Sequence, residues 1–377
     1  MKILIFGFGK NYETAKQYNL FDKDEIIAFI DNDEKKQNKF FENKPVIAPN
    51  QIHNFDFDKI IIASLAYDEI YDQLLSLGID KYKIFHHIEG VIIPTLVLET
   101  HVKQVVPDGH FYSTIPSKEE IEFGLKTART TKKIEGIDFN IEKQLELAKQ
   151  FLAVQEDISF PNEESLEYRY YSNNGFFPEG CAKTLYSMIR TFQPKNIIEI
   201  GSGFSSALML DTNVKDFDNK INCTFIEPYP EERLNLLLRK DDYQTTKIYK
   251  NKIQEVDLDI FKILKENDIL FVDSSHVCKV GSDVQKILFE ILPSLNKGVI
   301  IHFHDIIYPF EYHEQWFKEG RFWNEAYLLR AFLQYNEVFQ VILWGHYLNY
   351  NHLQELESLG SFLKEHPGGG LWVKKTK

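Results

Sequence analysis

Hydrophobic runs that end in glycine or polar residues dominate the second half of the chain. The first run, Asn196–Ile200, is rich in β-branched side chains, contains the acid Glu199 and leads directly into Gly201-Ser202-Gly203. Small and apolar residues follow and predict a helix. We therefore expect a strand, a tight glycine turn and the start of a helix, where the missing Cβ atoms let a ligand approach the backbone closely.

Three further runs follow in the same half of the chain, at Cys223–Glu227, Asp268–Asp273 and Gly298–Asp305. Each ends in an acidic side chain, and segments long enough for helices separate them. This alternation predicts one α/β sheet of the doubly wound kind, which binds ligands at the carboxyl ends of its strands. Glu227 is then placed to accept hydrogen bonds from ribose hydroxyls. For each acid taken alone, a helix cap or a solvated turn stays open as the alternative.

The first 90 residues repeat the pattern on a smaller scale. A strand over residues 2–6 leads into a glycine turn at residues 7–9 and a helix, and a second strand, Glu25–Ile30, ends at Asp31. This arrangement predicts a smaller, Rossmann-like α/β domain. Dinucleotide-binding turns carry a third glycine, but Tyr12 stands at that position, so we do not expect tight binding of NAD.

These patterns divide the 377 residues into a Rossmann-like domain over residues 1–90, a connector with helical stretches over residues 91–160, and the larger sheet domain over residues 161–377. The connector contains an aromatic segment, Pro107–Ile115. This segment fits either a cover over a ligand cleft or a plug in a domain interface.

Charge and composition narrow the choice of partners. The net charge of −13 at pH 7, without a basic stripe, argues against nucleic acids and anionic membranes. The apolar runs at the N-terminus and at Val91–Glu99 are far shorter than the ~20 residues of a membrane helix. The three cysteines lack metal-site spacing, which predicts free thiols in a reducing cytoplasm.

The segment Glu199-x-Gly201-x-Gly203 resembles motif I of the class I S-adenosylmethionine (SAM)-dependent methyltransferases, and similarity to a broad bacterial group of these enzymes covers residues 107–377. The resemblance implies that SAM is the cofactor. It also implies that strand-end residues of the sheet bind it: Glu199, Gly201, Ser202, Gly203, Glu227 and Asp273. The antiparallel hairpin that ends the sheet of these enzymes is expected in the last 40 residues.

Two later strand ends carry further chemistry. Asp273-Ser-Ser-His276 and His304-Asp305 resemble the metal-dependent sugar O-methyltransferases, whose pattern is Asp-x-x-His followed by Glu-Asp. The resemblance implies that Asp273 and Asp305 bind a divalent metal ion and that His276 is the general base. His304 stands where that family has Glu, and an imidazole suits Mg²⁺ poorly.

Three interpretations of these side chains stay open. A different metal binds, with His304 as its third ligand; or the metal site is weakened or lost, and His276 or His304 acts alone; or the cluster is a structural ion-pair network. His302 lies two residues before His304 and is expected to be a satisfied core histidine. The helix predicted over Arg321–Phe332 is expected to carry Glu325 on its surface.

The segment FIDNDEKKQ…KPVI in the first domain resembles the N-terminal domains of bacterial sugar acyltransferases, which can hold a nucleotide-linked sugar. The domain is therefore either a docking unit for substrate or a degenerate unit used for packing or homodimerisation. Together the resemblances predict a cytoplasmic enzyme that transfers a methyl group from SAM to a hydroxyl of a sugar or glycan precursor. The alternatives are a small-molecule methyltransferase for an amine, phosphate ester or carboxylate, and a non-catalytic nucleotide-binding scaffold in glycan assembly.

Overall fold

The computed structural model describes the chain except residues 19, 22–23, 65, 89–90, 95–105 and 132. It consists of two units, Met1–Val105 and Val106–Lys377, so the division falls between the boundaries expected at residues 90 and 160. Part of the apolar run Val91–Glu99 lies outside the described residues. Within the described ranges, no helix combines the length and the hydropathy needed to cross a membrane.

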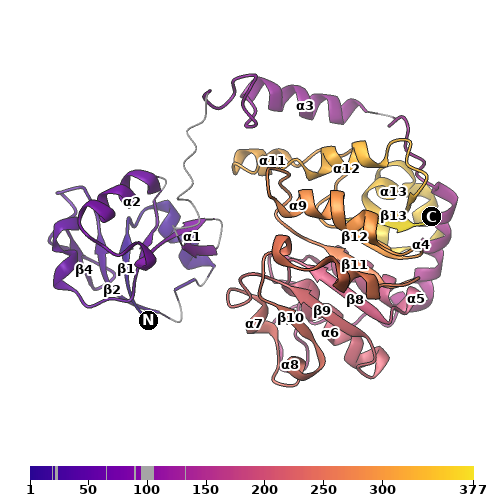
Figure 1. Cartoon of the computed structure of the whole chain (residues 1–377), viewed down its shortest axis with the longest axis horizontal. Helices are drawn as coiled ribbons and strands as arrows, with labels where there is room; N and C mark the ends of the chain where they lie inside the picture. Colours follow the sequence, from indigo (N-terminus) through magenta and orange to yellow (C-terminus); the bar gives the residue numbers. More distant parts are fainter. Residues whose placement is uncertain (19, 22–23, 65, 89–90, 95–105, 132) are drawn as a thin grey trace. The chain divides into compact units, whose positions relative to one another are not determined.

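The first unit is built on a seven-stranded sheet with the order β3-β4-β2-β1-β5-β6-β7 (Figure 1). Neighbouring strands from β4 to β6 pair in parallel, whereas β3 and β7 pair antiparallel at the edges. The elements are β1 (Lys2–Phe6), α1 (Lys10–Gln17), β2 (Glu25–Ile30), β3 (Lys39–Phe41), β4 (Lys44–Ile47), β5 (Lys59–Ile62), α2 (Tyr67–Ser76), β6 (Ile84–Ile88) and β7 (Val91–Pro94).

The apolar side chains of the strands in this unit point alternately to the two faces of the sheet, so a core forms on both faces. Leu4 and Phe6 pack in one apolar cluster, and Ile3 and Ile5 pack in another, because successive side chains of a strand point to opposite faces. The expected Rossmann-like architecture is confirmed. The antiparallel edge strand β3 was not expected from the sequence.

The second unit is also a seven-stranded sheet, with the order β10-β9-β8-β11-β12-β14-β13. The first five strands in this order pair in parallel, and β14 pairs antiparallel with β12 and with β13. The strands are β8 (Asn196–Ile200), β9 (Asn222–Ile226), β10 (Lys247–Tyr249), β11 (Ile269–Val272), β12 (Ile300–Phe303), β13 (Phe339–Trp344) and β14 (Leu371–Lys375). The class I methyltransferase sheet and its final antiparallel pair are therefore confirmed.

Helices cover this second sheet. In Figure 1, α4, α5 and α6 lie along one side of the strands and α9 lies on the other, and α5 packs against both α4 and α6. The helices are α3 (Lys118–Thr130), α4 (Ile141–Gln155), α5 (Glu179–Phe192), α6 (Phe204–Phe217), α7 (Leu234–Leu237), α8 (Asp242–Thr245), α9 (Asp283–Lys286), α10 (Leu292–Ser294), α11 (Glu314–Lys318), α12 (Glu325–Leu333), α13 (Gly345–Asn351) and α14 (Leu353–Leu359).

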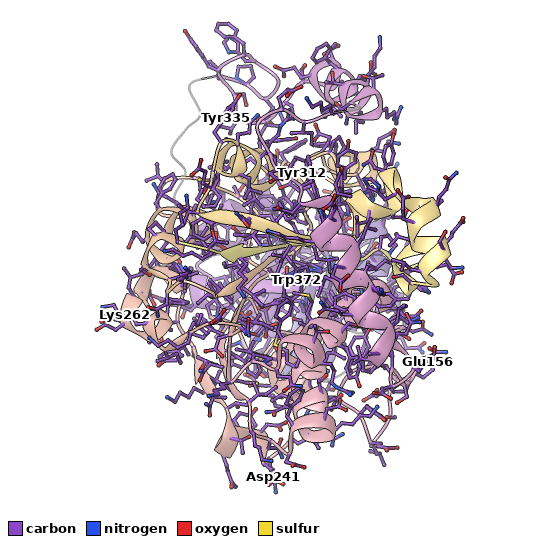
Figure 2. All side chains as sticks on the ribbon, turned by 90° about the vertical axis from the view of Figure 1, so that its right-hand side faces the viewer. Glu156, Asp241, Lys262, Tyr312, Tyr335 and Trp372 are labelled. Atoms are coloured by element: carbon purple, nitrogen blue, oxygen red, sulfur yellow. The ribbon has the colours of Figure 1, made fainter. Side chains whose placement is uncertain are left out.

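The core of the second unit is continuous from α4 to β14. Trp372 of β14 lies at its centre, whereas the exposed residues Glu156, Asp241 and Lys262 lie at the periphery (Figure 2). All the strand ends named in the sequence analysis of this unit come from parallel strands of one sheet, so they meet at one edge.

Candidate functional site

The glycine turn between β8 and α6 is pressed against the next strand end. Gly201 has φ +79°, and a Cβ atom there would lie 1.7 Å from the carbonyl oxygen of Asp273. No side chain fits that space. The amide of Asp273 donates to the Ile200 carbonyl at 2.9 Å, which holds the two strand ends together. The turn thus takes this shape only with glycine at position 201.

Glu199 acts from beneath the turn rather than at an open surface. Its side chain is fully buried, and it accepts hydrogen bonds from the hydroxyls of Ser205, at 2.5 Å, and Ser206 in the first turn of α6. Burial raises the pKa of Glu199 to about 8. The structure therefore places Glu199 as a link between β8 and α6, although the sequence suggested a direct contact with the cofactor.

Glu227 stands beside the same turn, immediately after β9. Its carboxylate accepts hydrogen bonds from the backbone amides of Ser202, at 3.0 Å, and Tyr229, at 2.9 Å. These two bonds fix the carboxylate next to the glycine turn. An acid held in this way is suited to accept hydrogen bonds from the hydroxyls of a ribose.

His276 lies at the centre of a cluster of carboxylates. Its ring is buried, with Nδ1 2.9 Å from Oε2 of Glu325. Its Nε2 lies 3.5 Å from Oδ1 of Asp273 and 3.6 Å from Oδ2 of Asp305, and both aspartate side chains are partly exposed. The imidazole is thus anchored on its buried side and directed toward solvent-accessible groups on the other.

The surrounding carboxylates determine the charge of His276. Burial by itself lowers the pKa of this imidazole, but hydrogen bonds to Asp273 and Glu325 and the negative charge of Asp305 outweigh it, so the pKa lies well above its usual value. The same arrangement keeps the pKa of Asp273 below its usual range, although burial opposes this; the charges of His304 and His276 are responsible. Opposite charges a few ångströms apart stabilise each other's ionised forms.

Two members of this cluster have strained backbones. His276 has φ +60° and Asp305 has φ +55°, which is the left-handed region that residues other than glycine seldom adopt. Each lies just beyond the end of a strand, where the chain turns. Strain of this kind costs of order 1–3 kcal/mol and gathers at functional sites.

His304 and His302 form a second hydrogen-bonded pair in β12 and just beyond it. Nε2 of His302 lies 3.1 Å from Nδ1 of His304. Burial lowers the pKa of His302 well below its usual value, so the ring is neutral. Its Nδ1 is buried and has no hydrogen-bond partner among the described residues. The proton of His302 is therefore assigned to Nε2, because an unpaired buried N–H is the costlier choice.

His304 lies between His302 and Asp305. Its Nδ1 lies 3.1 Å from Nε2 of His302, and its Nε2 lies 3.6 Å from Oδ1 of Asp305. His302 is buried as expected, but only one of its ring nitrogens has a partner within the described part of the chain. The four side chains Asp273, His276, His304 and Asp305 are thus brought to one edge of the sheet.

Comparison with known proteins agrees with this geometry. Residues 198–306 match a family described as a methyltransferase domain, and residues 1–85 match a family described as C2185-like, N-terminal. The second unit therefore contains a methyltransferase domain. An uncharacterized protein of Archaeoglobus fulgidus is 35% identical over 179 residues, which cover 46% of this chain and 79% of that protein. The chain belongs to the same family as this archaeal protein.

Solved methyltransferases resemble the chain more distantly. The O-methyltransferase TomG of Streptomyces achromogenes is 13% identical, with a TM-score of 0.35 over 70% of this chain and 100% of TomG. The methyltransferase PaMTH1 of Podospora anserina is 18% identical, with a TM-score of 0.34 over 70% of this chain and 99% of its own. An O-methyltransferase of Bacillus cereus is 12% identical, with a TM-score of 0.34 over 68% of this chain and 97% of its own.

The metal site expected on Asp273, His304 and Asp305 stays a prediction. Nε2 of His276 faces both aspartates, and Nε2 of His304 lies 3.6 Å from Oδ1 of Asp305. The two carboxylates are oxygen donors of the kind that Mg²⁺ takes, whereas an imidazole suits a transition metal better. In the described part of the chain, no group of three or more His, Cys, Asp or Glu side chains could hold a metal ion.

Glu325 is the residue that the sequence analysis misplaced. It was expected on the surface of α12, but it is 1% exposed and bonds to His276. The amides of Asn324 and Glu325 both donate to the His276 carbonyl at 3.1 Å, so the start of α12 is docked on the histidine loop. Glu325 and Leu329 are four residues apart and share one helix face. The position of this acid on the apolar face of the helix could have predicted that Glu325 is buried.

Aromatic side chains flank the histidine of the methyltransferase. The ring centroid of Trp323 lies 4.4 Å from that of His276 and 5.1 Å from that of Trp316. The hydroxyl of Tyr312 accepts a hydrogen bond from the Ala326 amide at 2.9 Å and so ties this group to α12. The helix that follows these rings, α12, was predicted from the sequence.

Proposed function

We propose that the methyltransferase acts on a hydroxyl of a neutral sugar or glycan precursor and that His276 is its general base. The observation that carries the proposal is the hydrogen bond of 2.9 Å between Nδ1 of His276 and the buried carboxylate of Glu325. This bond leaves Nε2 as the nitrogen that exchanges a proton with a substrate. A carboxylate at Nδ1 holds the ring in one orientation and stabilises the imidazolium after proton transfer.

The residues divide the work of the reaction. SAM, when bound, supplies an electrophilic methyl group. Glu227, which is fixed by the Ser202 amide, would bind the ribose of SAM, and the glycine turn would let SAM approach the backbone closely. A hydroxyl is a poor nucleophile, so the neutral form of His276 would accept its proton at Nε2 while the bond from the oxygen to the methyl carbon forms and the methyl–sulfur bond of SAM breaks, which leaves S-adenosylhomocysteine (SAH). The proton remains on the imidazole, whose raised pKa favours that state.

Charge supports a neutral acceptor. Three carboxylates, those of Asp273, Asp305 and Glu325, surround Nε2 and Nδ1 of His276. An acceptor with a phosphate or carboxylate near the reacting atom would be repelled by them. The rings of Trp323 and Trp316 offer apolar faces beside the base, and sugar acceptors are neutral molecules with both hydroxyls and apolar faces. The family resemblance of the sequence also favours a sugar.

The proposal is tested by the release of SAH with a panel of acceptors: neutral glycosides, nucleotide-linked sugars, phosphate esters, amines and carboxylates. We expect turnover with neutral hydroxyl acceptors only, and a loss of about 10²–10⁴-fold in His276→Ala, as for removal of a positioned base. The matched control is His86→Ala in the first unit, because His86 is equally buried but lies in the other sheet. Preferred turnover of an anionic acceptor would contradict the sugar assignment.

Chelation forms a separate arm of the same experiment. We expect turnover to survive EDTA, because the neutral imidazole of His276 can accept the proton of the hydroxyl without a metal ion. Abolished turnover that Mg²⁺ or Mn²⁺ restores would show that the side chains rearrange around a metal ion. SAM affinity measured in parallel separates a loss of chemistry from a loss of cofactor.

A further inference from the structure

Arg233 lies on the glycine turn of the cofactor site. It immediately precedes α7, and a Cβ atom added to Gly203 would lie 2.8 Å from its Cδ. The guanidinium carbon lies 3.9 Å from the centroid of the Phe176 ring. The side chain therefore runs across the start of α6 and ends in a guanidinium that lies over an aromatic ring.

Arg233 lies among acidic side chains but forms no ion pair with them within the described residues. Burial lowers the pKa of Arg233, while the negative charges of Asp273, Glu227 and Glu232 act in the opposite direction. Within the described residues, however, no hydrogen bond or ion pair joins the guanidinium to another side chain. Its N–H donors are thus available to a ligand, and the ring of Phe176 limits how the guanidinium can turn.

We propose that Arg233 binds the carboxylate of the methionine part of SAM. The proposal rests on SAM as the methyl donor. SAM brings one carboxylate to a site whose strand ends carry Glu227 and Asp273, and these acids would repel it. A guanidinium on the turn offsets that repulsion, and its planar fork matches a carboxylate with two parallel hydrogen bonds.

The test compares two ligands that differ in the amino-acid part. SAH contains the carboxylate, whereas 5′-methylthioadenosine shares the adenosine and the thioether but lacks the amino acid. Calorimetry is carried out on the full chain and on Arg233→Met and Arg233→Lys. We expect Arg233→Met to weaken SAH binding by roughly 10–100-fold, in the range of a lost charge-assisted hydrogen bond, and to change 5′-methylthioadenosine binding less than threefold. Arg233→Lys keeps the positive charge but lacks the planar pair of N–H donors. Its SAH affinity is therefore expected to lie between that of the unaltered chain and that of Arg233→Met.

Arg239→Met is the matched control. Arg239 is also an arginine of this segment, but its guanidinium donates to the carbonyls of Leu166 and Glu167 and not toward the turn. We expect its SAH affinity to match that of the unaltered chain. Equal loss for both ligands in Arg233→Met, no loss, or tighter SAH binding would overturn the role of Arg233. If the unaltered chain binds neither ligand, the cofactor assignment itself fails.

Discussion

The two units of the chain contain the same local arrangement with different outcomes. In each, a parallel strand leads into a glycine turn, at residues 7–9 in the first unit and at residues 201–203 in the second. In each, the next strand of the sheet is followed by an acid, Asp31 or Glu227. The local sequence pattern alone therefore does not distinguish the two turns.

The turns differ in how closely they approach the neighbouring strand. A Cβ atom on Gly7 would lie 3.1 Å from the Ala63 carbonyl oxygen, whereas one on Gly201 would lie 1.7 Å from that of Asp273. The acids differ as well. Asp31 bonds to Lys36 of its own unit at 2.8 Å, whereas Glu227 bonds only to backbone amides among the described residues. Asp31 therefore has a charged side-chain partner in its own unit, whereas the carboxylate of Glu227 is held by backbone amides beside the glycine turn.

The largest expected effect compares Gly201→Ala with Gly7→Ala. Both glycines have positive φ, +79° and +84°, so both substitutions strain the backbone. Only at Gly201 must the backbone of the next strand also move. We expect Gly201→Ala to abolish SAM binding and to cost at least ~3 kcal/mol of stability, and Gly7→Ala to cost about 1 kcal/mol. Urea unfolding and calorimetry measure both. Similar costs at the two positions would show that the turns are equivalent.

The second comparison concerns the two acids. Glu227→Ala is expected to weaken SAM binding by about 1.5–3 kcal/mol, as for lost hydrogen bonds to a charged group. Asp31→Ala is expected to leave SAM affinity unchanged, because its carboxylate bonds to Lys36. Isothermal titration calorimetry on folded variants measures both values. Unchanged affinity in Glu227→Ala would remove this acid from the cofactor site.

The third comparison concerns buried histidines. Burial lowers the pKa of His86 in the first unit, whereas carboxylates raise that of His276 in the second. A base works in its neutral form, so kcat/KM is expected to rise with pH through a midpoint above the usual value of His. Asp305→Asn removes a negative charge 3.6 Å from Nε2, so we expect the midpoint to shift about one unit downward. A midpoint that does not move would show that another group titrates.

The same pKa shift predicts a pH dependence of stability. The folded state holds the His276 proton more tightly than the unfolded state, so this stabilisation is complete below the unfolded pKa and is lost as pH rises through the raised folded pKa. Glu199 also has a raised pKa, so it acts in the same direction: the folded state keeps its proton longer than the unfolded state, and stability falls as pH rises from the unfolded pKa of Glu199 toward about 8. Both trends are read from unfolding free energies of His276→Ala and Glu199→Gln.

The sequence predicted those parts of the site that depend on local pattern. The apolar runs of β8, β9, β11 and β12 are short, β-branched and bounded by polar residues, so their strand ends could be located without a structure. The relation of His302 to His304 followed from the two-residue period of a strand. The edge strand β3 is short, with exposed residues, and gives a weak pattern.

The remaining site residues depend on tertiary contacts. Glu325 lies 49 positions after His276 and reaches it only because the start of α12 docks on the histidine loop. Arg233 stands in no recognised motif, and its relation to Gly203 and Phe176 appears only in three dimensions.

The smallest effect is expected with NAD, for which the first unit should show no saturable binding in the micromolar range. Tyr12 takes the place of the third glycine, and its ring is buried with its centroid 5.2 Å from that of Phe29. Its hydroxyl donates to Glu42 at 2.8 Å, so the ring is held in place beneath the turn. Fluorescence titration with NAD measures this, with SAH as the positive control on the second unit. If NAD binds with micromolar affinity and Asp31→Ala weakens this binding, the first turn still works as a dinucleotide site. The two units would then differ in the ligand that each binds, and not in whether the first unit binds a ligand.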